Sequence, residues 1–144
     1  MMRISYHPNG AQLSAYELAQ WVSAALTNLD VAPGVVIRVN DPKHPYFFGP
    51  EIVADDRETQ GGARFSRLRS IRRRASLEFQ LCKPEIEARW RDWHLATHGG
   101  RIAFVWEEPL TGERIAVTST LSTVSRRETY RRYQPASLEL IEWP

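Results

Sequence analysis

Two histidines, His94 and His98, stand four residues apart, which on a helix places both side chains on one face. The spacing is that of the zinc-binding pair in the HExxH motif, but position 95 is leucine, so the general base of that motif is missing. A third ligand would have to come from His44 or from a distant carboxylate. Because a histidine at a helix C-terminus also interacts favourably with the helix dipole, we predict structural roles for both residues and no metal site.

The other reactive side chains complete no catalytic constellation. Cys82, the only cysteine of the sequence, precedes a predicted helix whose dipole would lower a thiol pKa, but no base is near it in the sequence. Glu107 and Glu108 are neighbours on a predicted strand and therefore point to opposite faces. The glycine pairs 61–62 and 99–100 precede strands, whereas a phosphate-binding loop precedes a helix. We expect no enzymatic activity and no cofactor.

The basic residues are almost all arginine and fall into two clusters, although the net charge is only +2. The clusters are Arg64, Arg67, Arg69, Arg72, Arg73 and Arg74, and then Arg126, Arg127, Arg131 and Arg132. On a strand, Arg72 and Arg74 would project from one face about 6.6 Å apart. Such a ladder could follow nucleic-acid phosphates or pair with acidic side chains of a neighbouring subunit. It could also form local salt bridges to Asp55, Asp56 and Glu58.

The composition is that of a single globular domain covering residues 1–144. Hydrophobic residues make up 42% of the chain and charged residues 25%, both near globular averages. No apolar run approaches the roughly 20 residues of a membrane helix, and the N-terminus lacks the apolar run of a signal peptide. We expect a soluble protein, made in the cytoplasm, with no membrane partner.

Two segments have helical periodicity. Residues 14–29 begin with Ser14 and Glu17, which match a capping box, and the apolar residues that follow lie on one helical face. Residues 84–98 begin with Pro84 at a first helical position and continue with acidic residues in the first turn. Both segments are therefore predicted as helices.

The segments between the helices alternate between strand and loop patterns. Residues 35–39 are a β-branched run typical of a strand, and residues 40–50 contain three prolines and a glycine, which predicts a loop. Residues 51–63 are polar and predict a flexible or extended loop, with a short strand possible at 51–54. Residues 65–81 alternate with period two and give the strongest strand signal of the chain.

The C-terminal third predicts a hairpin and one or two closing strands. Residues 102–107 and 115–117 alternate on either side of a Pro-Leu-Thr-Gly turn. Residues 129–133 and 137–143 complete the strand pattern. The order of elements indicates a β-rich, antiparallel α+β fold, either a small barrel or a sandwich, with two flanking helices.

Four stretches from about Gly61 to the C-terminus occur in a recognisable order: RRRASLEFQL, PEIEARWRDWHLATHGG, RIAFVWEEPLTGERIAV and ASLELIEW. A long strand leads to a helix ending in a glycine pair, and an F-x-W-x-x-P stretch follows at residues 104–109. This order resembles the small minor tail proteins of long-tailed phages, the lambda-type tail-tip group related to distal tail proteins. Residues 63–144 would then be the tail-protein-like β core. Residues 1–62 would be an extension that opens with the helix, followed by a strand and the proline-rich loop.

The resemblance implies a structural protein that forms a homo-oligomeric ring, commonly a hexamer, between the tail tube and the baseplate hub. Its partners would be the tail tube, hub and tape-measure proteins, with DNA only as passing cargo, and its location would be the virion tail after synthesis in the host cytoplasm. Ring closure requires complementary charged faces on neighbouring subunits. We therefore predict subunit-interface residues Arg64, Arg67, Arg69, Arg72, Arg74, Asp55, Asp56, Glu107 and Glu108. The alternatives are another tail ring, such as a tail terminator, or a nucleic-acid-binding accessory protein that uses the arginine clusters.

Overall fold

The computed structural model describes residues 1–58, 60–79, 83–119 and 138–143, and within 51–57 and 64–70 it describes the backbone. The elements of this part of the chain are β1 (Met2–Tyr6), the 3-10 turn η1 (Gly10–Gln12), α1 (Ala15–Thr27), β2 (Val35–Val39), β3 (Phe47–Glu58), β4 (Arg64–Leu77), α2 (Pro84–Ala96), β5 (Phe104–Glu107), β6 (Arg114–Ser119) and β7 (Leu138–Glu142). The described strands form one antiparallel, seven-stranded sheet in the order β2-β1-β5-β6-β7-β4-β3. The predicted β-rich α+β class is confirmed. β2 and β3 are the edges of the described sheet, so closure into a barrel is not confirmed.

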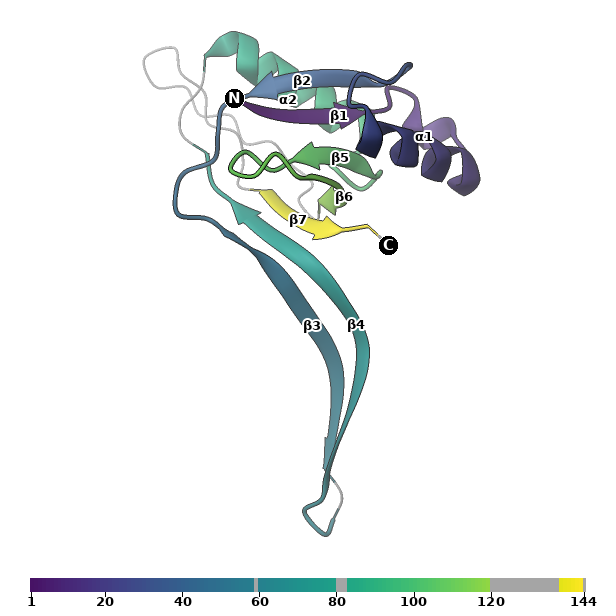
Figure 1. Cartoon of the computed structure of the whole chain (residues 1–144), viewed down its shortest axis with the longest axis vertical. Coiled ribbons are helices and arrows are strands. Elements are labelled where there is room, and N and C mark those ends of the chain that lie inside the picture. The colour runs from purple at the N-terminus through teal and green to yellow at the C-terminus, as the bar shows by residue number, and fades with distance from the viewer. Residues whose placement is uncertain (59, 80–82, 120–137, 144) are drawn as a thin grey trace.

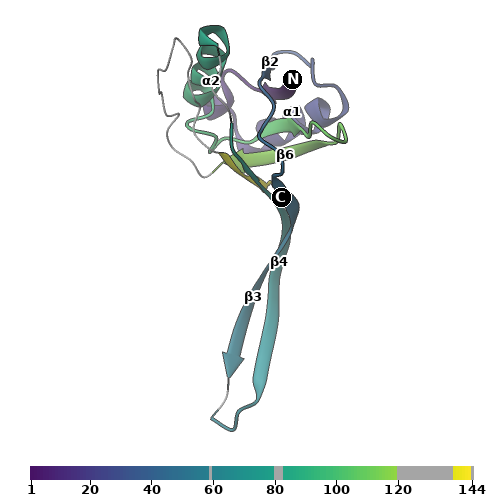
Figure 2. The ribbon, with the colours of Figure 1, turned by 90° about the vertical axis from the view of Figure 1, so that its left-hand side faces the viewer.

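The molecule consists of a body and an arm. The arm is the hairpin of β3 and β4, residues 47–77, and the body is the rest of the described chain. β7 pairs only with the last four residues of β4, Arg74–Leu77, so the base of the arm belongs to the main sheet. The remainder of the hairpin projects away from the body as a long curved ribbon, with its turn at the far end (Figures 1 and 2).

The first helix forms where its cap and apolar spacing predict it. The Ser14 hydroxyl accepts a hydrogen bond from the backbone N–H of Glu17 at 3.2 Å, which satisfies one free donor of the first turn. Trp21, Val22 and Ala25 are buried and pack with residues of β5 and β6. The prediction of a helix over 14–29 is therefore confirmed, with α1 covering one face of the sheet.

The second helix also matches its prediction. Pro84 occupies the first turn, where its missing N–H costs nothing. Trp90 and Trp93 are buried and meet Phe79 and Phe104 edge to face, with ring centroids 5.0 and 5.2 Å apart. The predicted glycine stop is confirmed by Gly99, which has a φ of 75° and donates to the His94 carbonyl oxygen at 2.8 Å.

The chain opens with a strand, which corrects the expectation that it opens with a helix. β1 lies between β2 and β5, and Met2, Ile4 and Tyr6 are buried in the core. Ser5 is buried as well, and its hydroxyl donates to the Leu29 carbonyl at 3.0 Å. The alternation is present in the sequence but covers only five residues, which is short for a period-two signal.

The predicted loop at 40–50 is confirmed over 40–46 and corrected over 47–50, and the predicted loop at 51–63 is corrected over 51–58, because β3 runs from Phe47 to Glu58. Its charged sequence forms a strand because β4 supplies backbone partners along its whole length, with one register shift between Val53 and Ala54. Pro50 is compatible with this position because β3 is an edge strand of the described sheet, where one side of the backbone needs no donor.

The predicted strand at 65–81 is confirmed over Arg64–Leu77, and Phe79 forms an isolated bridge with Pro42. Ala75, Leu77 and Phe79 are buried on the predicted apolar face. The hairpin of β5 and β6 and the strand β7 are confirmed too. The predicted strand at 129–133 lies outside the described residues.

Candidate functional site

The base of the arm is fixed to the body by Arg73. Its Nε donates to Glu142 Oε2 at 2.5 Å, and its Nη1 donates to the carboxylate of Glu113. The guanidinium carbon also lies 5.9 Å from the centroid of the Phe48 ring. The hydrogen bonds to Glu113 and Glu142 raise the pKa of Arg73, so this arginine stays charged and bound within its own chain.

A second arginine, Arg74, leaves the opposite face of β4 and also meets the body. Its Nη2 donates to Glu139 Oε2 on β7 at 2.6 Å. Both side chains are partly exposed, so the pair contributes at most about 1 kcal/mol of stability. Of the predicted interface residues, Arg74 therefore has an intrachain role at the arm base.

The remaining predicted arginines lie farther out on the arm, where the register places acidic residues opposite three of them. Arg72 pairs with Glu51, Arg67 with Asp55, and Arg64 with Glu58. Directly opposite residues of an antiparallel pair share one face of the ladder, so each of these positions has an opposite charge beside it. The whole arm contains seven arginines and four acidic residues. Three of the seven arm arginines therefore have an acidic residue directly opposite them in the register.

A β-bulge changes which residues of β4 share a face. Val53 pairs with Ser70 and Ala54 with Leu68, so Arg69 is the extra residue of the bulge. Leu68 therefore occupies the same face of the ladder as Ile71, although a spacing of three would separate them in a regular strand. Sequence reasoning missed this, because a bulge depends on the register of two strands.

The bulge produces an apolar band on one face of the arm. We define the apolar band as Pro50, Ile52, Ala54, Leu68 and Ile71, which the register places on the face of Phe48 and Ala75; Arg73, opposite Pro50, lies on the same face. At the body end this face is part of the core: Phe48 meets Trp106 edge to face at 5.5 Å, and Ala75 is 1% exposed. Farther out on the same face, Ile71 is 58% exposed. The face thus continues from the core into solvent.

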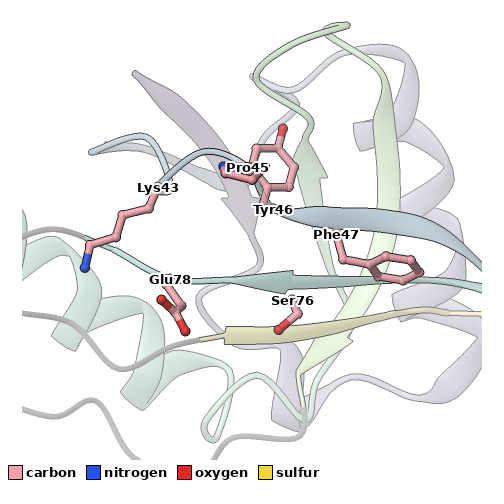
Figure 3. Close-up of a pocket in the computed structure, with 6 residues that line it drawn as sticks. All are labelled: Lys43, Pro45, Tyr46, Phe47, Ser76 and Glu78. Carbon is pink, nitrogen blue, oxygen red and sulfur yellow. The ribbon is translucent and has the colours of Figure 1, made fainter.

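The other face of the arm base has a shallow pocket of about 280 Å³ (Figure 3). It is lined by Lys43, Pro45, Tyr46, Phe47, Ser76 and Glu78. Lys43 and Glu78 lie at one end, where the Lys43 backbone N–H donates to the Glu78 carbonyl at 2.7 Å. The exposed Phe47 ring lies at the other end, against Gly49. The pocket is therefore lined by two opposite charges at one end and by an exposed aromatic ring at the other.

Glu107 and Glu108, predicted as interface residues, have partners within the chain and share none of them. Arg3 donates two hydrogen bonds to the Glu107 carboxylate, at 2.7 and 2.9 Å, and these bonds lower its pKa. Burial of Glu108 raises the pKa of its carboxyl group. Hydrogen bonds from Tyr46, Thr111 and Leu110 outweigh this effect, so the pKa lies below its ordinary value. Both acids therefore stabilise the β5–β6 hairpin of their own chain.

The histidine pair shows no ligand set in the described residues. His94 is half-buried with its ring 6.4 Å from that of Trp93, and His98 is exposed at the helix end with a φ of 52°. Among the residues that the structure describes, no three His, Cys, Asp or Glu side chains gather as a metal site. Cys82 and the arginines between 126 and 132 lie outside the described residues. No helix of the described part is long and apolar enough to span a membrane.

Comparisons with known proteins do not extend this description. No protein-family profile matches the chain, and neither the curated proteins nor the solved structures give a match.

Proposed function

We propose that this chain is a structural component of a phage or prophage tail tip, where it forms a ring that joins the tail tube to the baseplate hub. The sequence order of long strand, helix, glycine pair and hairpin supports this role by its resemblance to minor tail proteins. The observation that carries the proposal is the arm, which extends well beyond the body on two strands (Figure 1).

An arm of this kind is suited to assembly. A two-stranded hairpin without a third strand or a covering helix is marginally stable in water, so its outer part gains most from contacts with another molecule. The base of the arm is held by Arg73 and Phe48, which leaves the outer part to reach a neighbour. A contact between different surfaces of successive subunits closes into a ring when the rotation between subunits permits it.

Electron microscopy and mass measurement of the purified protein test the proposal. We expect closed rings, most commonly of six copies, and tails that lack the tip when the gene is deleted from its phage or prophage. Particles with complete tails after deletion would contradict the proposal, as would a protein that forms no ring at any concentration.

A nucleic-acid-binding accessory role is the second proposal, and the register of the arm supports it less. Arg72, Arg67 and Arg64 each lie opposite an acidic residue, which reduces the positive potential that phosphate binding requires. Titration with DNA and RNA at about 50 mM salt, where phosphate contacts are strongest, separates the two proposals. Tight binding that weakens steeply with salt would favour the accessory role.

A further inference from the structure

We propose that His7 is a pH-sensitive switch, which closes the connection between β1 and α1 when its ring is neutral and opens it when the ring is protonated. The inference is independent of the tail-tip role, because it concerns one buried side chain and the turn that it holds. It rests on the hydrogen bond that the ring accepts, on the burial of the ring and on its contact with α1.

The turn that follows β1 is closed by the backbone and by the ring of His7. The Asn9 backbone N–H donates to His7 Nδ1 at 3.0 Å, and the Gly10 backbone N–H donates to the His7 carbonyl oxygen at 3.2 Å. Because Nδ1 is an acceptor, the neutral ring carries its proton on Nε2. A protonated ring has hydrogen on both nitrogens and accepts no bond, so protonation sets two donors, Nδ1–H and the Asn9 N–H, against each other.

The turn has little space in which to separate these two donors while it stays packed. Gly10 is buried, and a Cβ at this position would lie only 2.9 Å from Ile102 Cγ2, in the segment that leads into β5. His7 itself is 7% exposed. Relief of the conflict therefore requires the turn to move away from the residues that pack against it.

The surroundings of His7 do not compensate for a positive charge. Burial lowers the pKa of the ring below its ordinary value of 6.5, and no ionisable group contributes to this shift. The described elements around the turn carry Arg3 and Tyr6 on β1, Tyr16 and Glu17 on α1, Asp30 before β2, Asp92 on α2, and His98 and Arg101 before β5.

The contact with Trp21 transmits the change to α1. The rings of His7 and Trp21 meet edge to face, with centroids 5.5 Å apart and an angle of 87° between their planes. The Trp21 indole N–H is buried with no hydrogen-bond partner in the described part of the chain, so this ring is held by packing. A Cβ at Gly34 would lie 2.7 Å from Trp21 Cζ2, so the ring also contacts the segment before β2. Displacement of His7 therefore loosens α1.

The direction of the pH dependence follows from the two protonation states. Below pH 6.5 the unfolded chain binds a proton at His7 that the folded ring, with its lower pKa, does not bind. His7 therefore leaves stability unchanged well above pH 6.5, and stability falls as pH decreases from 6.5 toward the folded pKa. Within this window the equilibrium constant for unfolding rises by at most about tenfold per pH unit.

Urea denaturation between about pH 7.5 and 5 tests the role of the ring with the full chain. His7→Asn supplies an amide oxygen that accepts from the same backbone N–H, two residues on, but does not titrate. We expect the unfolding constant of this variant to change with pH at least about threefold less than that of the wild type. His98→Asn is the matched control, because His98 is exposed and its φ of 52° suits asparagine, and its profile should be that of the wild type. Equal pH dependence in His7→Asn and the wild type would overturn the proposal.

Nuclear magnetic resonance of the wild-type protein locates the change without a substitution. The nitrogen shifts of His7 should place the proton on Nε2 at neutral pH, and the ring should titrate below pH 6.5. The amides of Asn9 and Gly10 should lose their protection from hydrogen exchange at a pH where the amides of β5 retain it. A neutral ring protonated on Nδ1 would overturn the proposal. So would loss of protection at Asn9 and in β5 at the same pH, as expected for global unfolding by acid.

Discussion

The body and the arm are parts of one sheet, but their apolar residues have different surroundings. β4 runs through both regions: Ala75 and Leu77 are at most 1% exposed, whereas Ile71, four residues before Ala75 on the same face, is 58% exposed. In the body, helices and neighbouring strands cover the apolar face. In the arm, the face continues without a covering element among the described residues. Period-two alternation therefore identifies which face is apolar but not which molecule covers it.

The body and the arm should differ most in how much free energy of unfolding is lost when a large side chain is replaced by a small one. Trp90→Ala removes a fully buried side chain that packs against Phe79 and Trp93, and it should lower the free energy of unfolding by about 3–5 kcal/mol. Ile71→Ala in the arm should change it by less than about 0.5 kcal/mol. Urea denaturation of both variants at low protein concentration measures the contrast. Equal losses would show that the arm packs within its own chain.

Two glycines with similar backbone angles give a second contrast. Gly100 in the body has a φ of 86°, and a Cβ there would collide with Ser119 Cβ and lie 3.2 Å from the Trp93 ring. Gly62 at the arm tip has a φ of 80° with nothing within 4 Å of the same atom. We expect Gly100→Ala to cost about 3 kcal/mol or more and Gly62→Ala about 1 kcal/mol.

Thermal unfolding of the two glycine variants provides the measurement. Gly112, with a φ of 73° and open space around it, is a further control in the body and should respond as Gly62 does. A small effect at Gly100 would mean that the connection after α2 is less tightly packed than the structure indicates.

The junction of the two regions is expected to be weaker than the core. Arg73→Met removes the bonds to Glu142 and Glu113 but keeps an apolar stem over Phe48, and it should cost about 1 kcal/mol because the side chains are partly exposed. Hydrogen exchange of the amides of Phe48 and Ala75 should increase, while exchange in α1 stays unchanged. Arg72→Met is the matched control. Uniformly faster exchange would contradict a local role.

The smallest expected effect is a change in the pH dependence of stability, and it arises from an ion pair in the body. The bonds from Arg3 lower the pKa of Glu107 below its ordinary value of 4.5, so below that pH the unfolded chain binds more protons than the folded chain. The stabilisation is therefore complete above pH 4.5 and is lost as pH falls through the lower folded pKa. Urea titrations between pH 7 and 3 should show a shallower loss, by up to about 1 kcal/mol, for Glu107→Gln.

Salt provides the control for the pH prediction, since about 1 M NaCl should reduce the difference between the wild type and the Glu107 variant. Identical pH profiles at low salt would show that the Arg3–Glu107 pair contributes nothing measurable to stability.

Local signals predicted the helices, the β5–β6 hairpin and most of β4. Ser14 and Pro84 mark helix starts through chemistry that acts within one turn, so they can be read from the sequence alone. β3 could not be predicted in full because its polar residues become a strand through pairing with β4. The residues of β1 alternate between apolar and polar, but five residues are too few for this alternation to identify a strand.

The candidate site was predictable in composition but not in arrangement. The arginine cluster and the acids at 55–58 were evident as charges, and their pairing across the arm required the register. The apolar band depends on the bulge at Arg69, which brings Leu68 to the face of Ile71. No sequence period encodes that shift, so the residues that share this face could not be identified before the strands were aligned.

Hydrogen exchange of the arm as a function of protein concentration tests the central claim, that the arm is a surface for association. The account predicts that backbone amides of Arg64–Arg72 exchange rapidly in dilute protein and become protected as concentration rises. Amides of α1 and β5 should keep the same protection throughout. Arm amides that are equally protected at all concentrations would contradict it.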